Sequence, residues 1–97
     1  MTDEKLTPVH PGEHLAEFLD DFGIGSERLA QDLQVPLIRI HAIINGQSAI
    51  SADMALRLSR YFGTSATFWM ALQAKYELAL AEHEAGDAIS RLPCVVA

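Results

Sequence analysis

The residues whose side chains are best suited to binding chemistry lie within one short segment in the middle of the chain. Arg39 can pair with the O6 and N7 atoms of guanine or hold a phosphate, and His41 can donate to an acceptor at a base edge. Asn45 can contact the nucleic-acid backbone or cap a helix, whereas the apolar Leu37, Ile38 or Ala42 on the same outward face can meet the methyl groups of thymine. This combination predicts a surface that reads duplex DNA.

Further groups are expected to position this surface on the phosphate backbone. They are the side chains of Arg28, Gln47 and Arg57 and the backbone amides near Ser26. The net charge of −6 would by itself argue against a nucleic-acid partner, because duplex binding relies on Lys and Arg. Acids dominate the first third of the chain, however, and basic residues outnumber acids between 33 and 75. The predicted DNA-reading segment lies inside this basic region.

Other chemistry has little support in the sequence. His10 and His14 have the i, i+4 spacing of a metal-binding pair, but Pro11 and Gly12 intervene and no third ligand is evident. The chain has no Gly-rich phosphate loop. Its one cysteine, Cys94, cannot form an internal disulfide or a thiolate zinc site within one chain. We therefore expect no catalysis, no cofactor and no metal.

The DNA-reading segment is expected to lie on a pair of short helices between Ser26 and Gly46. Apolar residues at helical spacing predict that both helices close on one core: Leu29, Ala30, Leu33, Val35, Ile40 and Ile43. Ser26 has the hydroxyl of a favoured N-cap for the first helix, and Pro36 suits the first turn of the second. Gln34 falls in the turn, where a left-handed backbone would be costly for a residue with a Cβ.

Two of the remaining helices are expected on either side of this unit. The first begins at Pro11 and stops at Gly23, since Pro suits the first helical position and Gly a helix end. The second is capped by Ser51 and ends at Gly63. The apolar stripe of the first helix leaves an acidic outer surface, made of Glu13, Glu17, Asp20 and Asp21.

The last helix is expected to be the longest and to mediate self-association. Ser65 or Thr64 caps it, and it runs from about 66 to 85 before Gly86. Its apolar coverage is wider than one stripe: Phe68, Trp69, Met70, Leu72, Tyr76, Leu78, Ala79 and Leu80. Because a helix with more than one apolar face is either deeply buried or shared with another subunit, we expect a homodimer through this helix.

The length and composition fit one domain with an all-α fold, since 97 residues of which 49% are hydrophobic can bury one core. We divide the chain into a mobile lead-in at 1–9, a helix-turn-helix domain at 10–86 and a tail at 87–97. No apolar run approaches the roughly 20 residues that span a bilayer, and the N-terminus lacks the apolar core of a signal peptide. A soluble, cytoplasmic protein without a membrane partner is expected.

Residues along most of the chain resemble one family. The pair of helices is similar to the helix-turn-helix of the lambda-repressor-like DNA-binding proteins. Over roughly residues 7 to 80 the chain resembles a HigA-type antitoxin, through His10-Pro11-Gly12-Glu13, Ile50 to Leu58, Phe62-Gly63-Thr64-Ser65, Phe68-Trp69, Leu72-Gln73 and Tyr76. The resemblance implies a five-helix lambda-repressor-like fold, binding of a dimer to its own operator DNA, and neutralisation of a HigB-type toxin that cleaves messenger RNA.

The chain also departs from the pattern of this family. Members often carry basic residues early in the second helix of the unit and a Lys after Asn-Gly, whereas Leu37 and Ile38 are apolar here and Gln47 is neutral. Two other functions are therefore considered. One is a stand-alone repressor without a toxin, and the other is a protein-binding module with weak DNA binding whose acidic first helix and tail meet a basic partner.

Overall fold

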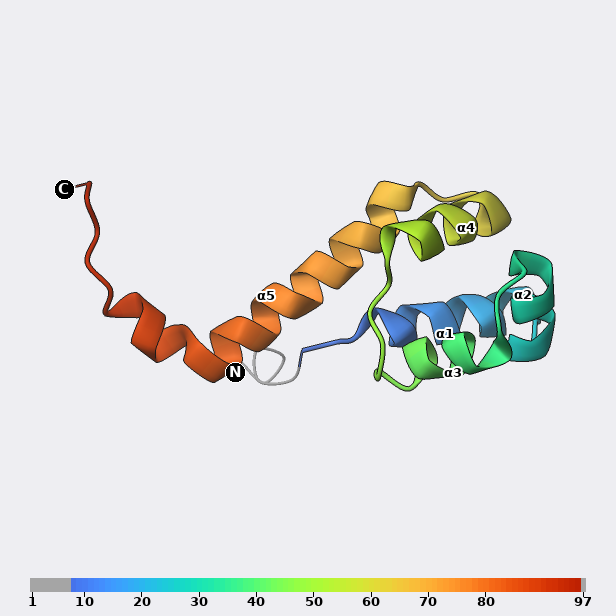
Figure 1. The fold of residues 1–97 in the computed structure, drawn as a ribbon, viewed down its shortest axis with the longest axis horizontal. Helices are drawn as coiled ribbons and strands as arrows, with labels where there is room; N and C mark the ends of the chain where they lie inside the picture. Colours follow the sequence, from blue (N-terminus) through green and yellow to red (C-terminus); the bar gives the residue numbers. More distant parts are fainter. Residues whose placement is uncertain (1–7, 97) are drawn as a thin grey trace.

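The computed structural model describes residues 8–96, and within them the chain forms five helices and no strand (Figure 1). The predicted all-α fold with a long C-terminal helix is confirmed. Residues 1–7, most of the expected lead-in, lie outside the described residues. The helices are α1 (Pro11–Phe22), α2 (Ser26–Leu33), α3 (Leu37–Ile44), α4 (Ala52–Phe62) and α5 (Ala66–Ser90).

Helix α1 begins and ends where the sequence predicts. His10 is its N-cap, and the ring Nδ1 accepts a hydrogen bond from the backbone N–H of Gly12 at 2.9 Å. Gly23 ends the helix with a φ of 65°, a left-handed conformation that glycine adopts without a Cβ clash. The predicted acidic surface is exposed along the whole helix, at Glu13, Glu17, Asp20 and Asp21.

The helix-turn-helix unit of α2 and α3 forms as predicted, but both caps lie one residue away from the expected position. Gly25, not Ser26, is the N-cap of α2, and its carbonyl accepts from the N–H of Leu29 at 3.1 Å. Glycine serves nearly as well as serine there because the cap is extended. Pro36 is the N-cap of α3 and not part of its first turn, since its ψ of 142° is extended.

The turn between α2 and α3 keeps the left-handed conformation that glycine favours, although Gln34 occupies it. Gln34 has φ 60° and ψ 47°, so the turn is not adjusted to avoid strain. Its own N–H donates to the carbonyl of Gln31, and the N–H of Val35 donates to the carbonyl of Ala30 at 3.0 Å. These bonds and the burial of the Val35 side chain offset a backbone cost of about 1–2 kcal/mol.

Side-chain caps fix the starts of α4 and α5. Ser51 and Ser65 each accept a hydrogen bond from the backbone N–H three residues later, at 3.1 and 3.0 Å. Ser65 is therefore the cap of α5, and the hydroxyl of Thr64 instead accepts from the indole N–H of Trp69 at 2.7 Å. Gly63 ends α4 with a φ of 74°, as predicted.

Helix α5 is longer than the sequence indicates. It continues through Gly86 to Ser90, so the predicted end at 85 is wrong. One glycine in an exposed helix costs only about 1 kcal/mol, and the turn that follows is closed by the Ser90 hydroxyl, which donates to the Asp87 carbonyl. The C-terminal half of α5, residues 77–90, extends beyond the other helices (Figure 1) and accounts for the 52 × 27 × 21 Å shape.

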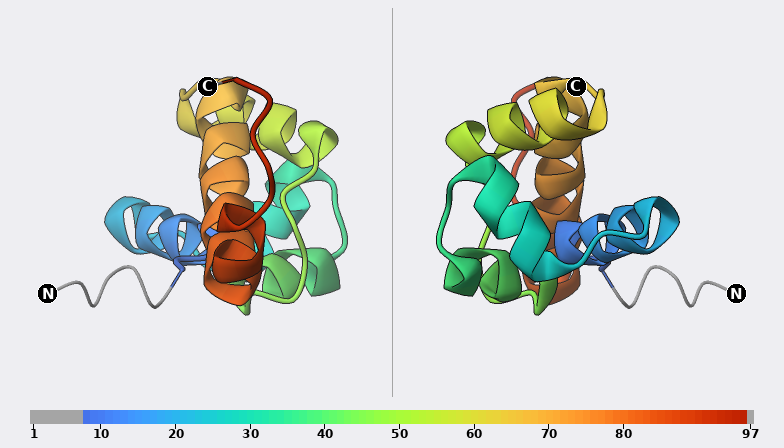
Figure 2. Two further views of the ribbon diagram at one scale, coloured as in Figure 1. Left: turned by 90° about the vertical axis from the view of Figure 1, so that its left-hand side faces the viewer. Right: turned by 90° about the vertical axis from the view of Figure 1, so that its right-hand side faces the viewer.

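The core lies where α1 to α4 meet the first half of α5 (Figure 2). The indole of Trp69 is fully buried and packs against Phe18 and Phe62, with ring centroids 5.1 and 6.3 Å away. Every apolar position predicted for the helix-turn-helix core is buried. The core consists of Leu15, Leu19, Leu29, Ala30, Leu33, Val35, Ile40, Ile43, Ile50, Met54, Ala55, Leu58 and Trp69.

Candidate nucleic-acid interface

Helix α3 presents its polar residues to solvent because its opposite side is fixed in the core. Ile40 and Ile43 are buried, with 0% and 2% of their surface exposed. Arg39 and His41, predicted to read bases, are both exposed. Ile38 is 76% exposed, which leaves its side chain available to an apolar group such as a thymine methyl.

Leu37 departs from the outward position expected from the sequence. Its side chain is half-buried and packs against the core, because it stands at the first turn of α3 where that helix meets the rest of the unit. Ala42 is half-buried as well. The contact surface of α3 is therefore narrower than predicted and centres on Ile38, Arg39 and His41.

Asn45 and Gln47 lie in the turn that follows α3, and both side chains are exposed. Asn45 is the C-cap, with its N–H donating to the carbonyl of His41 at 2.9 Å. The N–H of Gln47 donates to the carbonyl of Ala42 at 2.8 Å. Since these bonds use backbone groups only, both amide side chains stay available at the end of the exposed surface of α3.

Arg28 extends the exposed polar surface onto α2. Its Nε lies 3.4 Å from Oδ2 of Asp32, and the hydroxyl of Tyr61 donates to the same oxygen at 2.6 Å. This hydrogen bond to Asp32 raises the pKa of Tyr61 above its usual value. An exposed ion pair of this kind is weak, so a phosphate can replace Asp32 as the partner of Arg28. No side chain caps α2, which leaves its first backbone amides as a second anion-binding feature.

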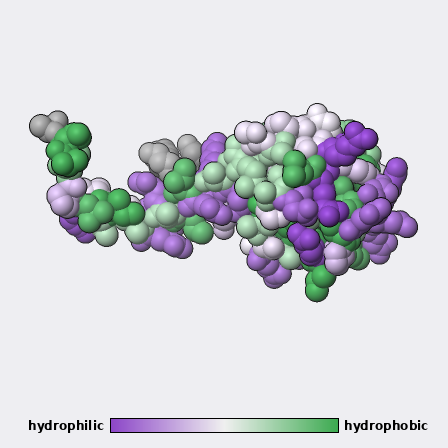
Figure 3. Space-filling view, turned by 45° about the horizontal axis from the view of Figure 1, so that its top comes forward, coloured by the Kyte–Doolittle hydropathy of each residue, from purple (hydrophilic) through white to green (hydrophobic). Residues whose placement is uncertain are grey.

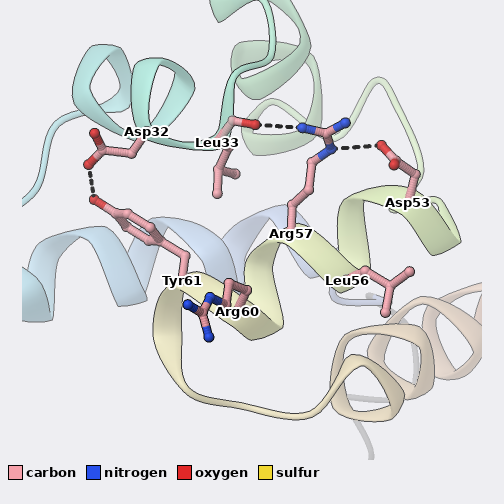
Figure 4. A pocket seen from close by; sticks show the side chains of 7 residues that line it. All are labelled: Asp32, Leu33, Asp53, Leu56, Arg57, Arg60 and Tyr61. Atoms are coloured by element: carbon pink, nitrogen blue, oxygen red, sulfur yellow. Dashed lines mark hydrogen bonds and ion pairs between the residues drawn. The ribbon is translucent and has the colours of Figure 1, made fainter.

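Arg57 is half-exposed, and its guanidinium is engaged by groups of the protein itself. Its Nε donates to Asp53 at 2.9 Å and its Nη1 donates to the carbonyl of Leu33 at 2.6 Å (Figure 4). That carbonyl ends α2 and has no partner within the helix, so Arg57 joins α4 to the turn of the unit. Together with Leu56 and Arg60, these residues line a hollow of about 410 Å³. Arg28 and Gln47 are consequently better placed than Arg57 to hold phosphates.

Gly12 and Gln73 hold the helices around this surface in place. The sequence pattern predicts no structural role for either residue. Gly12 lies so close to α3 that a Cβ there would overlap the carbonyl oxygen of Ile43. Gln73 is buried in α5, and its Oε1 accepts from the N–H of Ile50 at 2.9 Å, across 23 residues of chain. Both appear in the sequence only as members of family-like motifs, since neither helical periodicity nor charge distinguishes them.

The histidines considered as metal ligands do not form a cluster. Within residues 8–96 no group of three or more His, Cys, Asp or Glu is arranged to hold a metal ion. His10 is buried as the cap of α1, while His14 is only half-buried. The described helices also include none that combines the length and apolar character required to cross a membrane.

In helix-turn-helix DNA-binding proteins the second helix of the unit lies in the major groove, and α3 is the corresponding exposed helix here. A helix-turn-helix family model matches residues 15–69. Virulence-associated protein I of Dichelobacter nodosus is 42% identical over 81 residues, which are 82% of this chain and 75% of that protein.

Two solved structures are similar over nearly the whole chain. One is an addiction module antidote protein of a HigA family from Coxiella burnetii, with 41% identity and a TM-score of 0.87, covering 90% of this chain and 96% of that one. The other is the Pseudomonas aeruginosa antitoxin HigA with the higBA promoter, with 46% identity and a TM-score of 0.88, covering 94% and 100%. The chain belongs to the HigA-type antitoxins of the helix-turn-helix family, which are DNA-binding regulators and not enzymes.

Proposed function

We propose that this protein represses its own operator as a homodimer and neutralises a HigB-type toxin that cleaves messenger RNA. The observation that carries the DNA-binding part is the arrangement of α3, where buried Ile40 and Ile43 hold Arg39 and His41 in solvent. A HigA antitoxin of 46% identity was solved with promoter DNA, which supports the same role here.

The side chains divide into base-reading and backbone-positioning groups. Arg39 pairs with guanine O6 and N7, His41 donates to a base-edge acceptor, and Ile38 meets a thymine methyl. Asn45, Gln47 and Arg28 hold phosphates on either side. Leu37 acts indirectly, because its half-buried side chain sets the position of the first turn of α3.

The homodimer forms through the C-terminal half of α5, residues 77–90. Leu78 and Ile89 are 72% and 53% exposed on this segment, and hydrophobic surface recurs along it (Figure 3). An apolar groove of about 410 Å³ lies beside the preceding turns of α5, lined by Pro8, Val9, His14, Leu72, Lys75, Tyr76 and Ala79. A second α5 would bury these side chains. The two α3 helices would then meet half-sites spaced by one helical turn, about 34 Å, or a multiple of it.

The toxin partner is supported by family membership and by charge. The acidic surface of α1 is exposed and lies on a different helix from the DNA-reading residues. A basic ribonuclease would be attracted to this surface, and complementary charge mainly speeds the encounter. The two activities can therefore occupy separate surfaces of one small domain.

The toxin part requires a neighbouring reading frame that encodes a small basic protein, and co-expression with that protein tests it. The neighbour alone should arrest growth and degrade messenger RNA, and this protein should restore growth and co-purify with it. If this protein binds the operator but does not restore growth, it is a stand-alone repressor. Co-purification without operator binding would instead support a protein-binding module. Protection of the upstream region from nuclease digestion tests the DNA part independently.

A further inference from the structure

The imidazole of His10 is buried where three elements meet. It is 9% exposed, and its Nδ1 accepts from the N–H of Gly12 at the start of α1. The ring lies against Gly46 in the turn after α3, where a Cβ would be 3.7 Å from the ring Cγ. It also packs edge-on against Tyr76 of α5, with ring centroids 4.8 Å apart. One side chain thus contacts the start of α1, the end of the DNA-reading helix and the long helix.

This arrangement holds only while the imidazole is neutral. Nδ1 must keep its lone pair to accept from Gly12, and a protonated imidazole has two N–H groups and no acceptor. Protonation would therefore place two donors against each other at the N-cap. It would also put a positive charge at the N-terminus of α1, the end of the helix that already carries partial positive charge.

Burial opposes a charge on His10 more strongly than its surroundings compensate it. On α1 the opposite charge is the Glu13 carboxylate, on α5 the ring meets the neutral phenol of Tyr76, and the turn from 45 to 51 contains no charged residue. Burial lowers the pKa of His10 below 6.5, while the Ser48 backbone and the Glu13 carboxylate act in the opposite direction. The folded protein therefore binds this proton less readily than the unfolded chain does.

We propose that His10 is a pH-sensitive clamp: its protonation releases the cap of α1 and the turn after α3, and so weakens operator binding in mildly acidic conditions. The loss of operator affinity rests on the proposed DNA-binding function, whereas the clamp is a property of the fold. Because the unfolded state takes up more protons below about 6.5, stability is fully present above that pH. It falls as the pH drops toward the folded pKa of His10.

Thermal unfolding of the wild type and His10→Asn at pH 7.5 and 5.5 tests the clamp. Asparagine caps helices without titrating, and all other ionisable groups are unchanged. The wild-type melting temperature should fall further between the two pH values than that of His10→Asn. His83→Asn, an exposed change on α5, should keep the wild-type fall. Equal falls for the wild type and His10→Asn would overturn the proposal.

An NMR titration of the wild-type imidazoles keeps the test valid if His10→Asn folds poorly. The His10 resonance should titrate below 6.5 and shift together with the amide of Gly12. A midpoint at or above 6.5 would contradict the clamp, because protonation would then cost the folded state nothing.

Operator affinity at the two pH values tests the functional consequence. The comparison is made in His41→Gln, so that the exposed imidazole on α3 does not contribute to the pH dependence of binding. Affinity should weaken at pH 5.5 in His41→Gln and weaken less in the double variant with His10→Asn. Equal weakening would refute the link to DNA binding. Absence of operator binding by the wild type at pH 7.5 would count against the proposed function, while the melting comparison would still decide the clamp.

Discussion

The α carbon of Gly12 lies against the backbone carbonyl of Ile43, leaving no room for a Cβ between α1 and α3. This contact joins the first turn of α1 to the last turn of α3. Glycine is required by the close approach of two backbones and not by an unusual φ, since Gly12 lies within α1. The position of α3 relative to the rest of the domain therefore depends on a residue without a side chain.

Gly12→Ala should destabilise the protein by about 3 kcal/mol, because the two helices must separate to admit the methyl group. Urea unfolding measures the change. Gly86→Ala is the matched control, since a Cβ there meets only the flexible side chain of Glu82. That control should be stabilising by roughly 0.5–1 kcal/mol, as expected for glycine in a helix. Similar unfolding free energies for the two variants would show that the close approach is unimportant.

Gln34→Gly should stabilise the protein by about 0.5–1 kcal/mol. The left-handed backbone of Gln34 carries a Cβ cost that glycine removes, and this gain exceeds the greater freedom of glycine in the unfolded chain. Gln31→Gly, an exposed change inside α2, should destabilise by about 1 kcal/mol. Urea unfolding separates the two. A loss of stability in Gln34→Gly would mean that the Gln34 side chain makes a compensating contact.

Gln73→Leu should cost roughly 1–3 kcal/mol, because the buried N–H of Ile50 loses its acceptor and no other group replaces it. Glu77→Gln is the control, since an amide oxygen can still accept from the Nε2 of Gln73 at this exposed position. Its unfolding free energy should change by less than about 0.5 kcal/mol. A neutral Gln73→Leu would show that the loop before α4 is held by packing alone.

Leu78→Lys should dissociate the homodimer while leaving the monomer folded. The side chain is 72% exposed in one protomer and lies in the part of α5 proposed to pair. Sedimentation equilibrium gives the dissociation constant, and circular dichroism reports the helical content. Leu56→Lys changes a leucine on α4 that is 62% exposed and should leave the dimer intact. If both variants sediment like the wild type, α5 is not the dimer interface.

Sequence periodicity predicts the fold but does not predict the contacts between helices. Buried positions such as Leu29 and Ile40 recur at helical spacing, and the caps Ser51 and Ser65 have side chains that bond backbone amides. The end of α5 was missed because Gly86 is tolerated in an exposed helix, where its cost is only about 1 kcal/mol. Helix propensity alone does not show where a glycine stops a helix.

The candidate site could be predicted only in part for a similar reason. Arg39 and His41 are exposed as expected because the buried residues of α3 set its rotation in the core. Leu37 is half-buried because it stands where α3 meets its neighbours, which a helical pattern does not specify. Arg57 was considered as a phosphate contact, but its guanidinium reaches back to the Leu33 carbonyl. Such contacts link residues distant in sequence and leave no periodic signal.

Binding to a labelled duplex from the upstream region shows whether α3 reads the protein's own operator. The wild type and Arg39→Ala are compared on this duplex and on a scrambled one across a salt series. We expect specific wild-type binding that falls steeply with salt, and a loss of operator affinity of at least about tenfold in Arg39→Ala at unchanged melting temperature. Equal, weak binding of the wild type to both duplexes would contradict this expectation.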